Sequence, residues 1–272
     1  MNANGHKQEA MPPADGIVAV NNLREVSAAL GDTPETVIVQ QFLRDGAVEV
    51  LCAGAPADLE GMLIQVNAFP EEPIAFGGSA EAVASLLPHL SGWTCVNVPA
   101  ALVDDLIGPV AETAEAESVR LLDDVHHVLR QPVPPGLGGP ARLLDSADEH
   151  LVRNAPGVLL GAGVERVLDR IETGHVAGVI EDGELVSLAL TFAISDLHAD
   201  IGVATHPDWR GKGYGTNVAA RVATAVLSDG RTPVWSCGGT NLASMGIARR
   251  LGFEEVFRRV YLIPEWDEAE SQ

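Results

Sequence analysis

The sequence predicts an α/β protein made of two halves, each a mixed, largely antiparallel twisted sheet flanked by helices. Apolar runs typical of strands alternate along the chain with amphipathic stretches typical of helices. With 272 residues and 46% hydrophobic content, the chain is long enough for two modest cores. Residues 131–140 hold four prolines and three glycines, which disfavour helix and strand interiors, so we expect a linker there.

Hydrophobic periodicity places the elements of the first half, and Asp45-Gly46 indicates a hairpin turn between its first two strands. We expect helices at residues 22–30, 79–90 and 100–107, and strands at 35–42, 48–52, 73–76, 93–98 and 118–129.

In the second half, Asp182-Gly183 again indicates a hairpin, and Gly252 after Arg249 and Arg250 marks the end of a helix. We expect helices at residues 157–173, 216–227 and 241–251, and strands at 175–180, 184–192, 200–205, 233–237 and 254–263. The predicted organisation is a disordered start at 1–15, an N-terminal α/β domain at 16–130, the linker at 131–140, a second domain at 141–264 and an acidic tail at 265–272.

Composition limits the kinds of function. No apolar stretch approaches the roughly 20 residues that span a bilayer, and the first 14 residues are too polar for a signal peptide, so we expect a cytoplasmic protein. The cysteines Cys52, Cys95 and Cys237 are too widely spaced to indicate a disulfide framework or a metal site.

The net charge of −21 disfavours nucleic acids and anionic membranes as partners. We therefore expect a small-molecule amine as the partner, and a protein that is a monomer or a homodimer. The acidic excess either attracts a cationic substrate or serves solubility.

The most informative motif is Arg-Gly-Lys-Gly-Tyr-Gly at residues 210–215, between an apolar run and an amphipathic helix. Glycines let the backbone approach an anion, and a helix start offers free N–H groups and positive charge. Lys212 is one of only two lysines in the chain. The motif therefore predicts a phosphate-binding turn. Phe-Gly-Gly-Ser at residues 76–79 occupies the matching place in the first half without a cation, which indicates a duplication whose first copy does not bind.

Glycine spacing distinguishes the classes of phosphate-bearing ligand. No G-K-[ST] follows for a nucleoside triphosphate loop, and Thr216 stands where a dinucleotide fold needs its third glycine. Residues 203–215 instead resemble the signature [Q/R]-x-x-G-x-[G/A] of the GNAT superfamily of acyl-CoA-dependent N-acyltransferases, through Arg210, Gly213 and Gly215. The resemblance covers about residues 142–263 and includes Asn241, a small residue at Ser244 and the Leu-Gly-Phe of residues 251–253.

The resemblance implies that backbone N–H groups of the turn hold the diphosphate of acetyl-CoA, and that the pantetheine arm lies along the preceding strand. The implied binding residues are Val203, Ala204, Thr205, Arg210, Gly211, Lys212, Gly213, Tyr214, Gly215, Thr216 and Asn241. No metal is implied.

The chemistry needs a base for the attacking amine and an acid for the leaving thiolate. Asp200, His198 and Asp196 are the nearest base candidates, with Glu181 and Asp182 on the hairpin behind them. The family's usual tyrosine is here Ala248, so the acid is Ser244, Cys237, Ser236 or water.

These inferences predict an N-acetyltransferase that acetylates a primary amine, on a small molecule, by direct attack in a ternary complex. The missing tyrosine keeps open an acyl-CoA-binding sensor without catalysis. A structural α/β pair whose glycine turn is only a tight connection is the third alternative.

Overall fold

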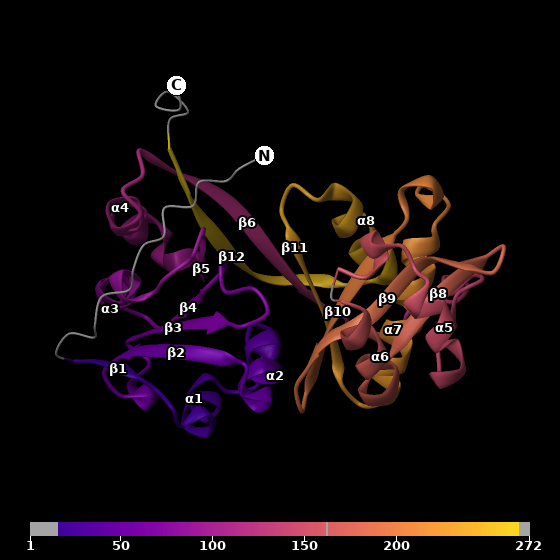
Figure 1. Ribbon diagram of the computed structural model, residues 1–272, viewed down its shortest axis with the longest axis horizontal. Coiled ribbons are helices and arrows are strands. Elements are labelled where there is room, and N and C mark those ends of the chain that lie inside the picture. The colour runs from indigo at the N-terminus through magenta and orange to yellow at the C-terminus, as the bar shows by residue number, and fades with distance from the viewer. Residues whose placement is uncertain (1–15, 162, 267–272) are drawn as a thin grey trace. The chain divides into compact units, whose positions relative to one another are not determined.

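The computed structural model describes residues 16–161 and 163–266, which form two compact units (Figure 1). The N-terminal unit comprises residues 16–31, 42–124 and 258–266, and the C-terminal unit comprises residues 32–41, 125–161 and 163–257. This division differs from the expected boundary at 131–140, because each half lends a segment to the other unit. The expected start at 1–15 and most of the acidic tail lie outside the described residues.

The N-terminal unit is built on strands in the order β1-β2-β3-β4-β5-β12-β6, with helices packed on the sheet. Its main core lies under α3 and α4 and includes Leu63, Val98 and Leu262. The elements in the first half of the chain are β1 (Ile17–Ala19), α1 (Leu23–Leu30), α2 (Val37–Asp45), β2 (Val48–Ala53), β3 (Gly61–Val66), β4 (Ile74–Phe76), α3 (Ala80–Leu86), β5 (Val96–Pro99), α4 (Val103–Thr113) and β6 (Ser118–Val128), with short 3-10 helices at Pro56–Asp58, Leu87–His89 and Ala100–Leu102. Of these, α2 and β6 each continue into the C-terminal unit.

Two predictions for this region are wrong. Residues 35–42, expected as a strand, lie mainly in α2, because burial of Val37 and Phe42 in tertiary contacts outweighs the strand propensity of a β-branched run. Asp45-Gly46 ends that helix and makes no hairpin: Gly46 has φ 68°, and the Ala47 N–H bonds the Phe42 carbonyl, as in a glycine C-cap.

Strand β3 was missed by the sequence prediction. Every residue from Gly61 to Val66 is buried, so the alternation of apolar and polar residues that reveals a half-exposed strand is lacking. Strand β1 was missed as well, since its three residues are too few to show a period.

The C-terminal unit has the strand order β12-β6-β11-β10-β9-β8-β7. Asp182 and Gly183 have φ of 52° and 84°, which confirms the predicted two-residue hairpin between β8 and β9. The elements are β7 (Arg142–Leu143), α5 (Glu149–Arg153), α6 (Val164–Thr173), β8 (Val176–Glu181), β9 (Glu184–Ile194), β10 (His198–Thr205), α7 (Tyr214–Ser228), β11 (Thr232–Gly238), α8 (Leu242–Leu251) and β12 (Glu254–Glu265), with 3-10 helices at Ser146–Asp148, Gly157–Leu159 and Pro207–Trp209.

This sheet is covered on both faces. Ala177 and Val179 of β8 belong to the core under α7, whereas Val176 belongs to the core under α5 and α6. Successive strand residues point to opposite faces, so one strand supplies both cores. Residues 157–173 were expected as one helix, but a 3-10 turn at Gly157–Leu159 precedes a separate α6.

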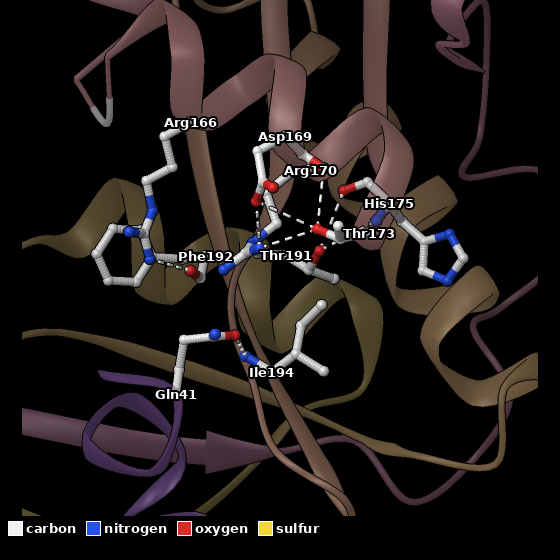
Figure 2. Close-up of polar contacts among 9 residues, drawn as sticks. All are labelled: Gln41, Arg166, Asp169, Arg170, Thr173, His175, Thr191, Phe192 and Ile194. Atoms are coloured by element: carbon white, nitrogen blue, oxygen red, sulfur yellow. Dashed lines mark hydrogen bonds and ion pairs between the residues drawn. The ribbon is translucent and has the colours of Figure 1, made fainter. Parts of the chain in front are cut away.

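Helix α6 is fastened to β9 by two arginines one turn apart (Figure 2). Arg166 Nη2 donates to the Phe192 carbonyl over 2.8 Å, and the buried Arg170 donates through Nε to the Thr191 carbonyl over 3.0 Å. Asp169 accepts a hydrogen bond from Arg170 Nη1 at 2.7 Å, which neutralises the buried guanidinium.

Residues 131–140 form neither helix nor strand, as expected, but they pack on the C-terminal unit. Asn217 Nδ2 of α7 donates to the Leu137 carbonyl over 2.6 Å, and Val133 and Leu137 contact the core under α7. The segment is therefore part of this unit, and its low regularity alone does not make it a free linker.

The two halves of the chain repeat one order of elements. Strands β2, β3 and β4, then α3, β5, α4 and β6, match β8, β9 and β10, then α7, β11, α8 and β12. The last strand of each half joins the sheet of the other half: β12 pairs antiparallel with β5, with Tyr261 opposite Asn97, and β6 lies beside β11. A duplicated arrangement with exchanged final strands accounts for the interleaved units.

Candidate active site

A groove of about 710 Å³ lies in the C-terminal unit. The end of β10, the glycine turn (residues 210–215), the first turn of α7 and one side of α8 form its walls. The lining residues are Val158, Val203, Ala204, Thr205, Trp209, Arg210, Gly211, Gly213, Tyr214, Gly215, Thr216, Asn241, Leu242, Ala243, Ser244, Gly246, Ile247 and Arg250. The groove thus gathers every binding residue predicted from the sequence except Lys212, together with Ser244.

The glycine turn presents a row of backbone donors. Gly211 and Gly213 have φ of 79° and 84°, a conformation that favours glycine. The first bond of α7 runs from the Asn217 N–H to the Gly213 carbonyl, so the N–H groups of residues 211–216 precede the helical ladder. Among the described residues none of these six groups has a hydrogen-bond acceptor. Together with the positive end of the helix dipole, they fit an anion.

The matching turn of the N-terminal unit is closed by its own backbone. Gly78 N–H bonds the Leu59 carbonyl over 3.3 Å, and Ser79 N–H bonds the Glu60 carbonyl over 3.0 Å. A Cβ at Gly77 would lie 2.5 Å from the Glu60 carbonyl oxygen, so this contact is tight. The N–H groups of Gly78 and Ser79 are therefore already used by the unit's own backbone.

The cationic and aromatic side chains at the glycine turn each have a partner nearby. Arg210 Nε donates to the Thr205 carbonyl over 3.3 Å, and Lys212 Nζ lies 3.9 Å from the centre of the Trp209 ring. Tyr214 stacks on Trp209 and donates its hydroxyl to a Glu181 carboxylate oxygen, and this bond raises the pKa of the tyrosine. Tyr214 is therefore engaged at the turn and is poorly placed to release a proton.

Strand β10 offers a free backbone edge to the groove. Its parallel register with β11 covers only His198 to Asp200, and beyond that point β10 continues to pair with β9 alone. Gly215 allows α7 to approach this edge, because a Cβ there would lie 3.3 Å from Thr205 Oγ1 and 3.1 Å from Ile247 Cδ1. The separation of the two parallel strands creates the cleft.

Helix α8 forms the other wall. Asn241 caps it by accepting the Ser244 N–H at 3.1 Å, at the residue where the sequence predicted the helix to begin. Ser244 Oγ accepts the indole N–H of the buried Trp235 at 3.0 Å. Because this bond occupies an acceptor site, the Ser244 hydroxyl hydrogen stays available on a residue that lines the groove.

Ala248, at the usual tyrosine position, is fully buried in the same core cluster as Trp235. Its small side chain leaves volume there for the indole ring. Ser244 is the hydroxyl that lines the groove on this part of α8.

Neither Asp200 nor His198, the two base candidates on β10, lines the groove. His198 Nδ1 lies 2.8 Å from Asp32 Oδ1 and its ring is largely buried, so it serves as a tie to residues 32–41. Asp200 is buried where β10 and β11 separate and accepts a 3.4 Å hydrogen bond from Ser236. Ala199 and Ile201 point into the core under α7, so Asp200 faces the opposite side of the sheet.

The remaining sequence candidates are also away from the groove. Glu181 is engaged by Tyr214, Asp182 lies in the hairpin turn, Asp196 lies in the β9–β10 turn, and Cys237 packs against the core under α7. Within the described residues no group of three or more His, Cys, Asp or Glu side chains could hold a metal ion. None of the helices described there is long and apolar enough to cross a bilayer.

Sequence reasoning missed several lining residues. Ala243, Ile247 and Arg250 share one face of α8, and Gly246 lies beside them with open space where a Cβ would be. Val158 comes from the 3-10 turn before α6. The helical spacing of residues 243, 247 and 250 was a usable signal, but only the fold shows which face of α8 meets the groove.

Comparison with known proteins agrees with this geometry. The GNAT acetyltransferase family model matches residues 170–261, which contain the free strand edge, the glycine turn and α8. Residues 170–261, in the C-terminal half of the chain, are therefore similar to a GNAT acetyltransferase domain. No curated protein matches the chain by sequence.

Solved structures resemble the chain over most of its length. A GCN5-related N-acetyltransferase-like protein from Streptococcus suis shares 21% identity and a TM-score of 0.60, over 88% of this chain and 98% of that one. A GNAT-family acetyltransferase from Colwellia psychrerythraea shares 12% identity and a TM-score of 0.61, over 92% of this chain and 99% of that one. A tandem GNAT protein from the clavulanic acid biosynthesis pathway shares 15% identity and a TM-score of 0.51, over 93% of this chain and 99% of that one. These likenesses establish the fold, two GNAT-like halves in one chain.

Proposed function

We propose that the protein is an N-acetyltransferase that moves an acetyl group from acetyl-CoA to a primary amine of a small molecule. The observation that carries the proposal is the row of six acceptor-free N–H groups at residues 211–216, in a groove that continues along a free strand edge. The closed turn at residues 77–79 shows by contrast that such a row is not a general property of this fold.

In this proposal the N–H groups of residues 211–216 hold the diphosphate and Arg210 adds charge. Lys212, now over the Trp209 ring, is within the same turn and adds a second cation. The backbone of Val203, Ala204 and Thr205 bonds the pantetheine arm as an added strand. Asn241 keeps its capping role at the start of α8, beside the same groove.

The donor supplies its acyl group as a thioester, which an amine can attack directly. Ser244 is the proposed proton donor at the leaving sulfur, because its hydroxyl hydrogen has no acceptor among the described residues. Asp200 is the proposed acceptor of the amine proton, through a bridging water, because it is buried where β10 and β11 separate and does not itself line the groove. His198 is the weaker base candidate, since Asp32 already engages it.

The second candidate function is an acyl-CoA-binding sensor without catalysis. The observation in its favour is Ala248, which is buried and carries no proton donor. Both functions need the groove, and they differ only in turnover.

Calorimetric titration with acetyl-CoA tests the shared claim. The wild-type protein should bind, and Arg210→Glu should weaken binding about tenfold or more, because a carboxylate then faces the diphosphate. Arg24→Glu, an exposed change of equal charge in the N-terminal unit, is the control and should bind as wild type. Lack of binding to the wild-type protein would refute both functions.

Thiol release in the presence of a panel of small primary amines separates the two functions. Release that depends on an amine supports the acetyltransferase. Tight acetyl-CoA binding with no release from any amine would favour the sensor.

A further inference from the structure

Strand β6, which ends in the sheet of the C-terminal unit, brings a buried histidine beside the point where β10 and β11 separate. The Leu129 N–H bonds the Pro233 carbonyl over 3.0 Å. Two residues earlier on β6, His127 Nδ1 lies 3.4 Å from the Trp235 carbonyl oxygen. Residue numbers fall along β6 as they rise along β11, so the two strands run antiparallel. This register places His126 across from the serine that follows Trp235.

Three polar side chains therefore form a row on the sheet face opposite α7: Asp200 on β10, Ser236 on β11 and His126 on β6. Val128 and Val234 belong to the core on that face. Strand residues two apart share a face, so His126 and Ser236 point the same way. The Ser236 hydroxyl donates to Asp200 Oδ1 over 3.4 Å. Side chains directly across an antiparallel pair have Cβ atoms roughly 5 Å apart, which makes His126 the next member of the row.

The row is buried at its two ends and partly exposed at its centre. Asp200 and His126 are each 5% exposed, whereas Ser236 is half-buried. The His126 ring stacks on Phe257 of β12, with the ring centres 4.4 Å apart and the planes at 21°, and Phe257 is half-buried as well. Stacking fixes the plane of the imidazole beside the serine, and the exposed parts of Ser236 and Phe257 let water reach the row.

The N-terminal unit fills the matching place with a permanent cation. Asn97 lies opposite Ile74 in the parallel pairing of β5 with β4. Two residues further along β5, Pro99 lies across from Arg259 of β12. The buried Arg259 reaches over β5 and donates through Nη2 to the Ala75 carbonyl of β4 over 2.5 Å. The separation between β4 and β5 is therefore bridged by a side chain of the protein itself.

His126 holds the position of Arg259 in the second copy. The last parallel pair of β10 and β11 is Asp200 with Val234, and Ser236, two residues further on, faces His126. An imidazole is shorter than an arginine side chain and, unlike a guanidinium, gains and loses a proton near neutral pH. The exchanged strand thus supplies a group capable of proton transfer where the other unit has a fixed cation.

Two other carboxylates near His126 are engaged elsewhere. Asp124, two residues earlier on β6, accepts a hydrogen bond from Asn97 Nδ2 over 3.1 Å. Glu255 of β12 acts through its charge on His127, which points into the core under α7 with Leu129. The part of α2 packed on the His126 face contributes apolar side chains to the core there. Asp200 is therefore the carboxylate that Ser236 connects to the histidine.

We propose that Ser236 and His126 form a relay behind Asp200 that carries the proton away from the acceptor amine. This inference rests on the proposed function. The Asp200 carboxylate takes the proton from the ammonium group through the bridging water, and the Ser236 hydroxyl then takes it from the carboxyl as its own hydrogen passes to an imidazole nitrogen of His126. The ammonium becomes a neutral amine that can attack the thioester, and the imidazolium releases its proton to water at the row. Ser236 and His126 act through Asp200 and are positioning residues.

His127 provides a matched control for His126. It is the adjacent histidine on the same strand and is 7% exposed, but it points to the opposite face of the sheet. Burial lowers its pKa, so it is held as the neutral ring. His126→Gln and His127→Gln each remove a buried ring from β6 and should both lower thermal stability. A difference between them in catalysis therefore reports the face of the sheet.

The experiment measures amine-dependent thiol release from acetyl-CoA as a function of pH, with the most reactive amine of the panel. His126→Gln and Ser236→Ala should each lower kcat about tenfold. Both should also move the acidic limb of the pH–rate profile to lower pH, because a carboxylate acting alone is protonated only in more acidic solution. His127→Gln should leave that limb in place and kcat within about twofold of wild type. Calorimetry should give the wild-type affinity for acetyl-CoA in all three variants.

Two further variants test whether the two residues act in series. The double variant His126→Gln with Ser236→Ala should lose no more activity than either single variant, because each substitution interrupts the same step. Ser236→Thr retains the hydroxyl and should keep most of the activity. Losses that multiply in the double variant would mean independent effects and would overturn the relay.

An unmoved acidic limb in both His126→Gln and Ser236→Ala would also overturn it, as would equal losses of kcat in the His126 and His127 variants. If His126→Gln does not fold, Ser236→Ala, at a half-buried position, decides the question. If wild-type protein releases thiol and these variants match it, the inference fails while the proposed function stands. If wild-type protein releases no thiol with any amine, the proposed function fails first.

Discussion

The indole N–H of Trp235 on β11 donates a 3.0 Å hydrogen bond to Ser244 Oγ in the first turn of α8. One side of the serine is therefore fixed by a buried ring, while its own hydrogen is free to serve a ligand in the groove. Ala248 in the same core makes room for that ring. We propose that this serine takes the place of the tyrosine expected from the family pattern.

Ser244→Ala should therefore lower kcat for acetyl transfer by about tenfold or more and leave acetyl-CoA affinity nearly unchanged. Ser244→Thr retains the hydroxyl and should keep most of the activity. Steady-state rates and calorimetry on the three proteins make the comparison. Equal kcat in wild type and Ser244→Ala would leave water as the proton donor.

The base assignment predicts opposite behaviour for the two candidates of β10. Asp200→Asn should remove the acidic limb of the pH–rate profile, because the proposed proton acceptor is lost. His198→Gln should keep the shape of the profile and lower thermal stability, since it breaks the bond to Asp32. A wild-type profile in Asp200→Asn would contradict the proposed base.

The hydrogen bond between Asp32 and His198 should also make the free energy of unfolding depend on pH in the acidic range. Burial would raise the pKa of Asp32, but hydrogen bonds from His198, Ser195 and the Leu197 N–H together lower it. A folded-state pKa below the unfolded value of about 3.9 stabilises the fold above that pH, and this contribution is lost as the pH falls through the folded value. Asp32→Asn should cost about 1 to 3 kcal/mol at pH 7 and show less acid destabilisation than wild type below pH 4.

Denaturant unfolding from pH 3 to pH 7 measures this dependence. Asp208→Asn is the control, because Asp208 is 84% exposed and its Oδ2 lies 3.8 Å from His206 Nδ1, beyond hydrogen-bond distance. Parallel stability curves for wild type and Asp32→Asn would mean that the tie contributes nothing.

Two substitutions at Gly246 test the stability of α8 and access to the groove separately. Nothing lies within 4 Å of a Cβ placed there, so Gly246→Ala should stabilise α8 by about 1 kcal/mol. Gly246→Phe should fold and yet bind acetyl-CoA at least about tenfold more weakly, because the ring fills the groove. Thermal unfolding and calorimetry on both variants give the two readings, and unchanged binding by the Phe variant would exclude this stretch of α8 from the ligand site.

The buried cysteines should be unreactive in the folded protein. Burial, followed by the charge of Glu25, raises the pKa of Cys52 to about 11, and burial together with Glu72 raises that of Cys95 to about 12. Both thiols remain protonated at pH 8, and a thiol reagent attacks the thiolate. Neither should be labelled in native protein and both should be labelled in denaturant; mass spectrometry of the labelled peptides reads the result, and rapid native labelling of Cys52 or Cys95 would contradict the burial.

Local sequence signals predicted the parts of the structure that depend on local chemistry. Asp182-Gly183 makes its turn because both positions need positive φ, and Gly252 ends α8 because its φ of 91° favours glycine. The glycine turn at residues 210–215 could be predicted for the same reason, because its glycines and cations are consecutive residues in the chain. Secondary structure was assigned wrongly where the hydrophobic residues show no clear period, as in the fully buried β3 and the β-branched residues of α2.

By itself the sequence determined that the chain has two α/β halves, where the glycine turn lies and which motif it resembles. Only the tertiary structure decided which sheet each final strand joins, that His198 is held by Asp32, and that Ser244 and Arg250 line the groove. Turns and caps are short-range interactions between neighbouring residues. Strand exchange, the packing of Trp235 over α8 and the lining of a groove depend on contacts between residues far apart in the chain, which no local pattern records.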